Sequence, residues 1–130
     1  MCIAILKTKK GNITDEQLKN SFISNSDGAG IAYTIKGKLI IEKGIVNVDK
    51  FIKAVRNAEK KCDSNMLIHC RIGTSGYKDK NNTHPFKVTN NVCLIHNGIL
   101  DVDVPKNSNI NDTQIFINDY MKEHGGENNE

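Results

Sequence analysis

The sequence predicts an α+β fold in which strands and helices do not alternate strictly. Short apolar runs typical of strands occur near the start and in the middle of the chain, and longer segments show the helical spacing of apolar residues. The chain has 130 residues and shows no repeat or linker, which suits one compact domain. We expect this domain to cover residues 1–130, ordered over 2–124, with a flexible tail at 125–130.

The first strand is expected at Cys2–Leu6, a short apolar run. Thr14 and Gln17 match a capping box, in which each side chain bonds the backbone N–H of the other residue. A helix should therefore begin after Thr14 and run to about Ile23. Residues 25–28, Asn-Ser-Asp-Gly, are typical of a turn.

A hairpin and a second helix are expected next. Strands at 30–35 and 38–42 are joined by a tight turn at Lys36-Gly37. Asn47 should cap the following helix. The apolar face of that helix is formed by residues at helical spacing: Val48, Phe51, Ile52, Val55 and Ala58.

The second half of the chain contains shorter elements. A strand is expected at 66–72, followed by a polar loop at 73–84. Another strand is expected at 91–95, and the alternation of apolar and acidic residues over 100–104 is typical of an edge strand. Asn111 should begin the last helix.

Composition and charge argue against several functional classes. The formal net charge is only +3, and no aromatic residues are interleaved among the lysine pairs, so nucleic-acid binding is not favoured. No stretch is long enough to span a bilayer, and the N-terminal lysines follow the apolar run instead of preceding it as in a signal peptide. We expect a soluble, cytoplasmic protein with thiols at all four cysteines: Cys2, Cys62, Cys70 and Cys93.

Cys2 is the first candidate catalytic residue. A small second residue permits removal of Met1, which would make Cys2 the first residue of the mature chain. Its α-amine, which titrates at about 7.7–8.0 in short peptides, can then accept the proton of its own thiol. A thiolate is a strong nucleophile. The alternative for Cys2 taken alone is a buried, purely structural cysteine.

Asn97 and Gly98 are candidates for stabilising an oxyanion. Acyl transfer needs preorganised donors, and the Asn97 side-chain amide with the Gly98 backbone N–H would supply two. Asn-Gly between apolar runs is also a strong hairpin signal. The two interpretations are compatible, because a turn at a strand end can present both donors.

An amino-acid substrate would need groups for its carboxylate and its ammonium. Arg71 keeps its charge when buried and binds a carboxylate through two hydrogen bonds. Thr74 and Ser75 can add hydroxyl and backbone donors, and Asp112 is a candidate for the ammonium. Alternatively, Asp112 is an acidic residue in a first helical turn, favoured by the helix dipole.

A metal site is not expected. The spacing Cys93-x-x-His96 is compatible with zinc, but no second pair stands at a familiar spacing. His69 and Cys70 would point to opposite faces of a strand, so both cannot easily bind one ion. Cys62 and Cys70 are interpreted as structural thiols.

Six segments resemble, in the same order, those of the class II glutamine amidotransferase domain, the glutaminase part of the N-terminal-nucleophile hydrolases. They extend over nearly the whole chain, and six in register are specific although each is short. The segments are Met1 to Ile3, Asn25 to Ala32, His69 to Gly76, Thr83 to Phe86, Ile95 to Gly98 and Asn111 to Gln114.

The resemblance implies an αββα four-layer sandwich and release of ammonia from glutamine. It implies that Cys2 is the nucleophile and that Asn97 and Gly98 form the oxyanion hole. It also implies substrate-binding roles: Arg71, Thr74 and Ser75 at the glutamine carboxylate, and Gly98 and Asp112 at its amine.

The chain departs from the family pattern at four points. Ile3 stands where the family usually has glycine. Ser24 and Asn25 occupy the place where many members carry an arginine that positions the substrate, and Ser75 replaces a frequent histidine. The chain also stops soon after Asp112, whereas family domains are usually longer, so we expect a sandwich shortened at its C-terminus.

Two functional hypotheses follow, with a simpler third. The first is a glutamine amidotransferase or glutaminase that forms a Cys2 glutamyl thioester, without metal or cofactor. A separate synthase or acceptor chain is then an expected partner, a γ-glutamyl peptide is an alternative substrate, and exposed sheet edges favour a homo-oligomer. The second is a module that binds an amino acid or a protein partner without turnover. The third is an α+β domain whose hairpin and caps only mimic the motifs.

Overall fold

A computed structural model describes residues 2–72, 83–96 and 112–121. The elements in chain order are β1 (Ile3–Lys7), α1 (Asp15–Ser24), β2 (Ala29–Ile35), β3 (Lys38–Ile45), α2 (Val48–Lys61), β4 (Met66–Cys70), β5 (Phe86–Lys87), β6 (Cys93–Leu94) and α3 (Asp112–Phe116). The last helix continues into a π-helical turn, Ile117–Met121. None of the helices in these ranges has the length and apolar character needed to cross a membrane.

Four strands form an antiparallel sheet in the order β1-β4-β2-β3. In β4, Cys70 is aligned with Ile3 of β1 on one side and with Ala29 of β2 on the other. The preceding residue, His69, is aligned with Gly30 of β2. Because successive residues of a strand face opposite sides of a sheet, Cys70 and His69 point to different faces.

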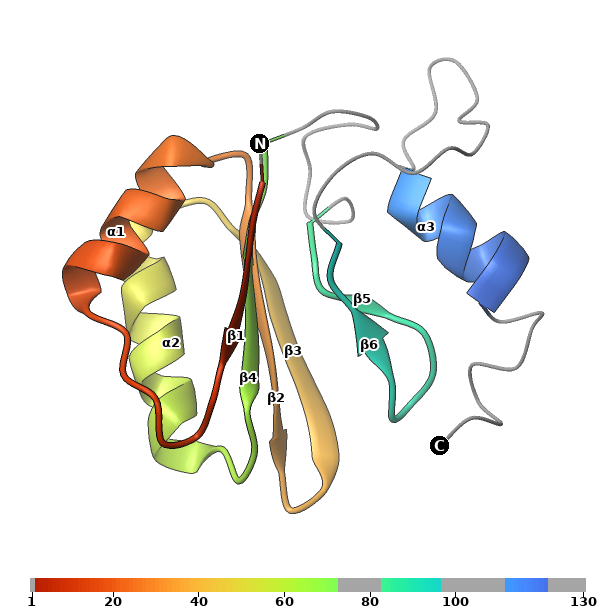
Figure 1. The fold of residues 1–130 in the computed structure, drawn as a ribbon, viewed down its shortest axis with the longest axis horizontal. Helices are drawn as coiled ribbons and strands as arrows, with labels where there is room; N and C mark the ends of the chain where they lie inside the picture. Colours follow the sequence, from red (N-terminus) through yellow and green to blue (C-terminus); the bar gives the residue numbers. More distant parts are fainter. Residues whose placement is uncertain (1, 73–82, 97–111, 122–130) are drawn as a thin grey trace.

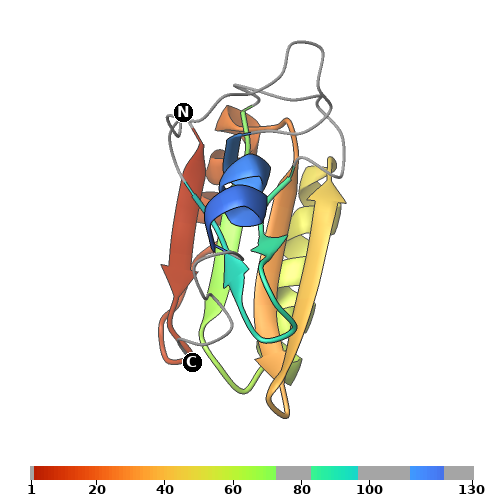
Figure 2. The same cartoon turned by 90° about the vertical axis from the view of Figure 1, so that its right-hand side faces the viewer.

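The elements lie in layers. Figure 1 shows α1 and α2 on one face of the four-stranded sheet, and the β5–β6 hairpin on the other face with α3 beyond it. In Figure 2 the hairpin and α3 lie in front of the sheet. This arrangement is α+β, as predicted. Closure into an αββα sandwich stays a prediction, because the described part of the second sheet has two strands.

The main hydrophobic core lies between the sheet and its two helices. Phe51 and Val55 of α2 are fully buried in one cluster with Ile31 and Ile68 of the sheet. Burial of such side chains contributes about 1.5–3 kcal/mol each. A smaller cluster joins the hairpin to the last helix and contains Phe86, Val88 and Ile117, with Val92, Leu94 and Met121 packed against them.

Three local predictions are confirmed. The Gln17 N–H donates to the Thr14 hydroxyl at 3.0 Å, and the Thr14 N–H donates to the Gln17 side chain at 2.9 Å, which completes the capping box. Lys36 and Gly37 have φ angles of 51° and 76°, so both residues of the tight turn between β2 and β3 are left-handed. Asn47 caps α2 through its side chain.

Strand β4 ends earlier than the expected range of 66–72. The ladder stops at Cys70. Beyond it, the Arg71 N–H donates to the Gly28 carbonyl at 2.9 Å, and the Arg71 carbonyl accepts from the Asp27 N–H at 2.8 Å. The backbone of this residue is therefore bonded to the turn before β2 instead of continuing a regular ladder.

The second sheet also differs from the prediction. β6 has two residues instead of the expected 91–95, because the N–H groups of Asn91 and Val92 donate to the Thr89 hydroxyl at 3.2 and 3.1 Å. β5 was not predicted. Of the polar loop predicted at 73–84, residues 73–82 lie outside the described residues, whereas Thr83 and His84 are buried. The predicted edge strand at 100–104, Asn111 and the tail also lie outside the described residues.

Two glycines let residues 83–86 approach the four-stranded sheet closely. A Cβ atom at Gly30 would overlap the backbone carbonyl of His84, and one at Gly28 would overlap the side chain of Thr83. Gly28 also has a φ of 139°, which residues with side chains rarely adopt. The Thr83 hydroxyl accepts a hydrogen bond of 3.0 Å from the Gly44 N–H of β3, which fastens the segment to the sheet.

We expect Gly30→Ala to lower the free energy of unfolding by about 1–3 kcal/mol, as overpacking of a close contact does. The obstacle at Gly30 is backbone, which cannot rotate away. Gly11→Ala is the matched control, because the nearest atom to its added Cβ is the Thr8 hydroxyl at 2.7 Å, which can rotate away, and the Thr8 backbone oxygen lies farther off, at 3.4 Å. Urea denaturation measures both variants, and equal losses of stability would contradict the close approach at Gly30.

Candidate active site

Cys2 precedes β1 and is half-buried. Its Sγ atom accepts a hydrogen bond from the Ile72 N–H and donates to the Ile72 carbonyl, each with a separation of 3.3 Å. The alignment of Ile3 with Cys70, continued by one residue, places Cys2 opposite Arg71. The thiol is therefore held beside the end of β4.

Arg71 is only 3% exposed. Its two backbone bonds to Asp27 and Gly28 place it between Cys2 and the turn that leads into β2. A guanidinium remains charged even when buried. This end of the sheet consequently combines a fixed cation with a half-exposed thiol.

Of the residues predicted for the site, the structure brings Cys2 and Arg71 together. Asp112 begins α3 as its first residue, and its side chain lies outside what the structure describes. The remaining predicted residues also lie outside the described ranges: Thr74, Ser75, Asn97 and Gly98. Their proximity to Cys2 stays a prediction.

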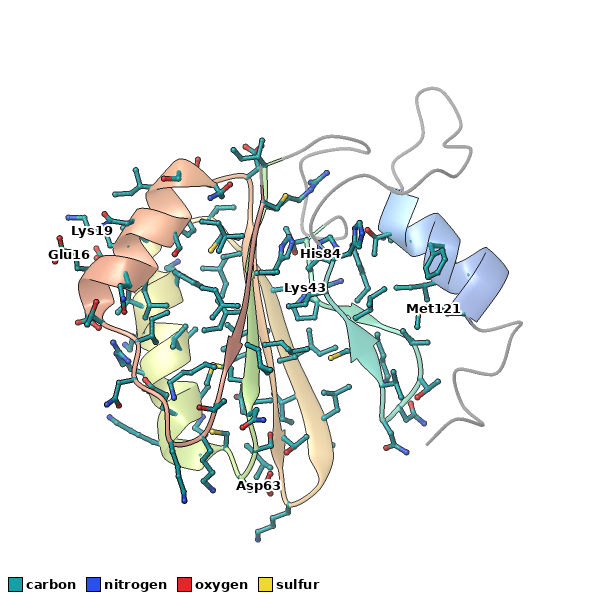
Figure 3. The ribbon with its side chains drawn as sticks, viewed as in Figure 1. Glu16, Lys19, Lys43, Asp63, His84 and Met121 are labelled. Atoms are coloured by element: carbon teal, nitrogen blue, oxygen red, sulfur yellow. The ribbon has the colours of Figure 1, made fainter. Side chains whose placement is uncertain are left out.

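A column of rings near Arg71 was not anticipated from the sequence. The rings of His69 and His84 stack with centroids 4.0 Å apart, and His84 contacts Phe86 at 4.5 Å. The Lys43 ammonium lies 4.5 Å from the centre of the Phe86 ring. Figure 3 shows His84 and Lys43 between the large sheet and the hairpin. The Thr83-His84-Pro85-Phe86 motif was the only signal, and it does not reveal a stack.

The His69 end of this column contacts the residue that directly precedes the predicted oxyanion turn. His69 is fully buried, and its Nε2 lies 3.0 Å from the backbone carbonyl oxygen of His96. His96 immediately precedes Asn97. The sequence offered His69 and His96 as possible metal ligands and as members of the resembling segments, and nothing in their spacing indicates a side-chain to backbone bond.

Both stacked histidines are held neutral. Burial lowers the pKa of His69 to about 4, although the bond to His96 opposes this, and the charge of Arg71 lowers it further. Burial also lowers the pKa of His84 to about 2, with added repulsion from His69 and Arg71. Among the described residues, neither ring nitrogen of His84 has a hydrogen-bond partner.

The opposite orientation of His69 and Cys70 is confirmed. Cys70 is fully buried in the core beneath the helices, whereas His69 stacks on the hairpin side. Burial, with the nearby Cys2, raises the pKa of the Cys70 thiol to about 12, which agrees with a structural thiol. Within the described ranges, no three His, Cys, Asp or Glu side chains group as they would around a metal ion.

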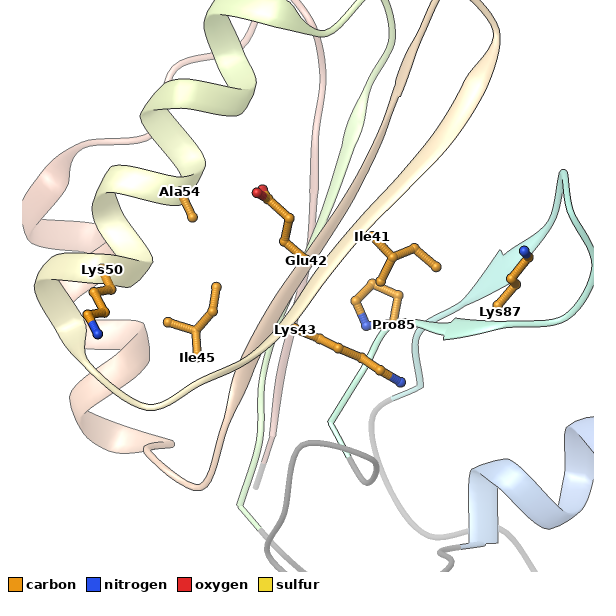
Figure 4. Close-up of a pocket in the computed structure, with 8 residues that line it drawn as sticks. All are labelled: Ile41, Glu42, Lys43, Ile45, Lys50, Ala54, Pro85 and Lys87. Carbon is orange, nitrogen blue, oxygen red and sulfur yellow. The ribbon is translucent and has the colours of Figure 1, made fainter.

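Two cavities lie at the edges of the large sheet. One of about 550 Å³ follows β3, with Lys43 and Lys87 on the hairpin side and Lys50 on the helix side, as Figure 4 shows. The other, of about 590 Å³, lies between β1 and α1 and includes Ile3. Neither is lined by Cys2 or Arg71.

Comparison with known proteins finds partial similarity to two enzymes. Over 95 residues, 72% of this chain, it is 33% identical to a glutamine–fructose-6-phosphate aminotransferase (isomerizing) of Pyrococcus horikoshii. Over 91 residues, 69% of the chain, it is 32% identical to the enzyme of the same name from Francisella tularensis. No model of a known protein family matches the chain.

The chain is similar to part of a glutamine-dependent aminotransferase. The matched segments amount to 16% and 15% of the length of the two relatives, so the chain spans a small part of each. Their names refer to glutamine and fructose 6-phosphate. The similarity therefore supports a relationship at the level of glutamine-dependent enzymes, and agrees with the motifs around Cys2 and Arg71.

We expect stability to fall as the pH is lowered from 7 to 5. In the unfolded chain a histidine titrates near pH 6.5, above the folded values of about 4 for His69 and about 2 for His84. The unfolded state then binds more protons below pH 6.5. The free energy of unfolding therefore falls progressively below pH 6.5, by about 2 kcal/mol per histidine at pH 5.

Urea unfolding at pH 7 and pH 5 measures this loss, and His84→Phe keeps an aromatic ring while removing one titrating group. The pH dependence of this variant should be about half of the wild-type value. Carboxyl groups contribute mainly at lower pH, since they titrate near pH 4 in unfolded chains. A variant with the full wild-type pH dependence would show that His84 binds protons equally well in the folded and unfolded states, which would contradict its lowered pKa.

Proposed function

We propose that this chain hydrolyses the side-chain amide of glutamine and releases ammonia, as the glutaminase part of an amidotransferase does. The observation that carries the proposal is the alignment of half-buried Cys2 with buried Arg71 at the end of the paired strands β1 and β4. The partial similarity to two glutamine–fructose-6-phosphate aminotransferases supports the choice of glutamine.

The proposed reaction begins after removal of Met1. The freed α-amine takes the thiol proton, and the Cys2 sulfur attacks the amide carbon of glutamine. The tetrahedral intermediate is stabilised by the Asn97 side chain and the Gly98 N–H. Its carbon–nitrogen bond breaks as the α-ammonium returns the proton to the leaving ammonia. Water then attacks the glutamyl thioester, which yields glutamate and regenerates the thiol.

Substrate recognition is assigned to groups around the thiol. Arg71 binds the glutamine carboxylate in a bidentate manner, with added donors from Thr74 and Ser75. Asp112, together with the Gly98 carbonyl, binds the ammonium. Neither a metal nor an organic cofactor takes part in any of these steps.

The proposal includes an αββα sandwich of the N-terminal-nucleophile type as the scaffold. Ammonia would pass to an acceptor handled by a separate synthase chain, and the edge strands β1 and β3 would be places for association with such a chain or with a second copy. Nucleic acid and membranes are not proposed partners.

A binding module without turnover is the second candidate. One feature beside the thiol favours it: Ile3 replaces the usual glycine next to Cys2. In that case glutamine should raise the melting temperature of Cys2→Ala while the wild-type protein releases no glutamate.

Intact mass and glutaminase activity test the enzymatic proposal together. The purified protein should lack Met1, and Cys2→Ala should lose at least about a thousandfold of the glutamate release, as expected when a covalent nucleophile is removed. Cys62→Ala is the matched control, since Cys62 lies at the far end of α2. Retention of Met1 in an active protein would rule out the α-amine as base, and activity that persists in Cys2→Ala would rule out the thioester.

Replacement of Arg71 should separate binding from chemistry. Arg71→Lys keeps the charge but loses the bidentate geometry, so KM for glutamine should rise about tenfold or more with a smaller change in kcat. Arg56→Lys is the control, because Arg56 bonds Asp15 and Glu59 at the helix surface. Steady-state kinetics give both parameters. A fall in kcat with an unchanged KM would contradict the assignment of Arg71 to the carboxylate.

A further inference from the structure

We propose that His69 is a positioning residue for the turn predicted at Asn97 and Gly98. Its ring nitrogen Nε2 lies 3.0 Å from the carbonyl oxygen of His96, the residue directly before Asn97. The inference rests on the proposed function, because the position of this carbonyl affects catalysis only if Asn97 and Gly98 form the oxyanion hole.

The bond fixes the state of the imidazole ring. A carbonyl oxygen only accepts hydrogen bonds, so Nε2 of His69 must carry the proton. Nδ1 of His69 has no partner among the described residues, and in the neutral ring it is a bare acceptor. His69 therefore has one N–H, and this N–H is directed at His96.

The ring of His69 is itself held firmly. β4 is an inner strand, paired with β1 on one side and β2 on the other. The stacked ring of His84 supports the imidazole from the hairpin side, at an interplanar angle of 29°. His84 cannot drift away from the sheet freely, because its backbone packs closely on Gly30 and Thr83 bonds Gly44. The bond thus anchors His96 to the rigid sheet.

His96 has few other constraints in the described structure. β6 ends at Leu94, two residues earlier, and only two residue pairs join β5 and β6. A peptide group is planar, so fixing the carbonyl oxygen of His96 also restricts the direction of the N–H group in the same peptide, at the start of the predicted turn. An oxyanion hole requires donors whose direction is preorganised.

The decisive comparison is between two substitutions of His69. His69→Phe keeps a ring for the stack but has no donor, and His69→Gln offers an amide N–H at a similar reach. We expect kcat for glutamine hydrolysis to fall about 10–100-fold in His69→Phe, because misplacement of catalytic groups by about 1 Å has effects of this size. KM should change little, and His69→Gln should recover most of the lost kcat.

Tyr33→Phe is the matched control, because it removes a polar group from another buried ring of the same sheet, on the helix side. It should leave kcat unchanged. Melting temperatures show whether each variant is folded. If His69→Phe is folded and keeps the wild-type kcat, or if His69→Gln is no better than His69→Phe, the positioning role is wrong.

A second measurement does not depend on activity. In NMR spectra, the Nε2 proton of His69 should be observed and protected from exchange with water. The backbone amide signals of Asn97 and Gly98 should shift in His69→Phe and stay near their wild-type positions in His69→Gln. Unchanged signals in both variants would overturn the inference. If the signals shift in His69→Phe but the wild-type protein has no glutaminase activity, the proposed function is rejected, whereas the anchoring of His96 by His69 is retained.

Discussion

The pairing of β4 with both β1 and β2 is the constraint on which the candidate site depends. Cys70 is aligned with Ile3 and with Ala29, so the end of β4 and the first residues of β1 and β2 meet at the same edge of the sheet. The bonds of Arg71 to the Asp27-Gly28 turn and of Cys2 to Ile72 lie just beyond that edge. A shift of β1 by one residue would move the thiol to the opposite face.

The second sheet reaches this edge only because two positions have no side chain. Gly28 and Gly30 leave room for Thr83 and for the His84 backbone, so the hairpin rests directly on β2. Close approach brings His84 over His69 and excludes water from both rings. The lowered pKa values of both rings therefore follow from backbone packing, and the cost of burying polar rings is limited because they stay neutral.

Features set by neighbouring residues could be predicted from the sequence. The capping box at Thr14, the left-handed turn at Lys36-Gly37 and the cap at Asn47 all depend on contacts within a few residues. The short β6 could not be predicted, because the Thr89 hydroxyl competes for N–H groups that a strand pattern assigns to a ladder. The histidine stack was missed since it requires two sheets to pack.

The candidate site, too, could be predicted from the sequence only in part. The motifs assigned Cys2 and Arg71 to one site, and the sheet register explains how residues so far apart in sequence become neighbours. The bond from His69 to His96 had no sequence signal, because any buried histidine can bond any nearby carbonyl. The oxyanion turn and the Thr74 segment lie outside the described residues, so their part in the site rests on the motifs.

The charge of Arg71 helps to decide which of the nearby groups can transfer protons. Its positive field is one reason why His69 and His84 have low pKa values. A bound carboxylate would weaken that field and raise both values, but burial is the larger cause and would persist. Both imidazoles would then remain neutral near pH 7, with or without substrate. Such groups are poor proton carriers at that pH and good fixed donors or stacking partners. In the proposed reaction, proton transfer is consequently assigned to the α-amine that removal of Met1 would free at Cys2, and the histidines hold nearby backbone in place.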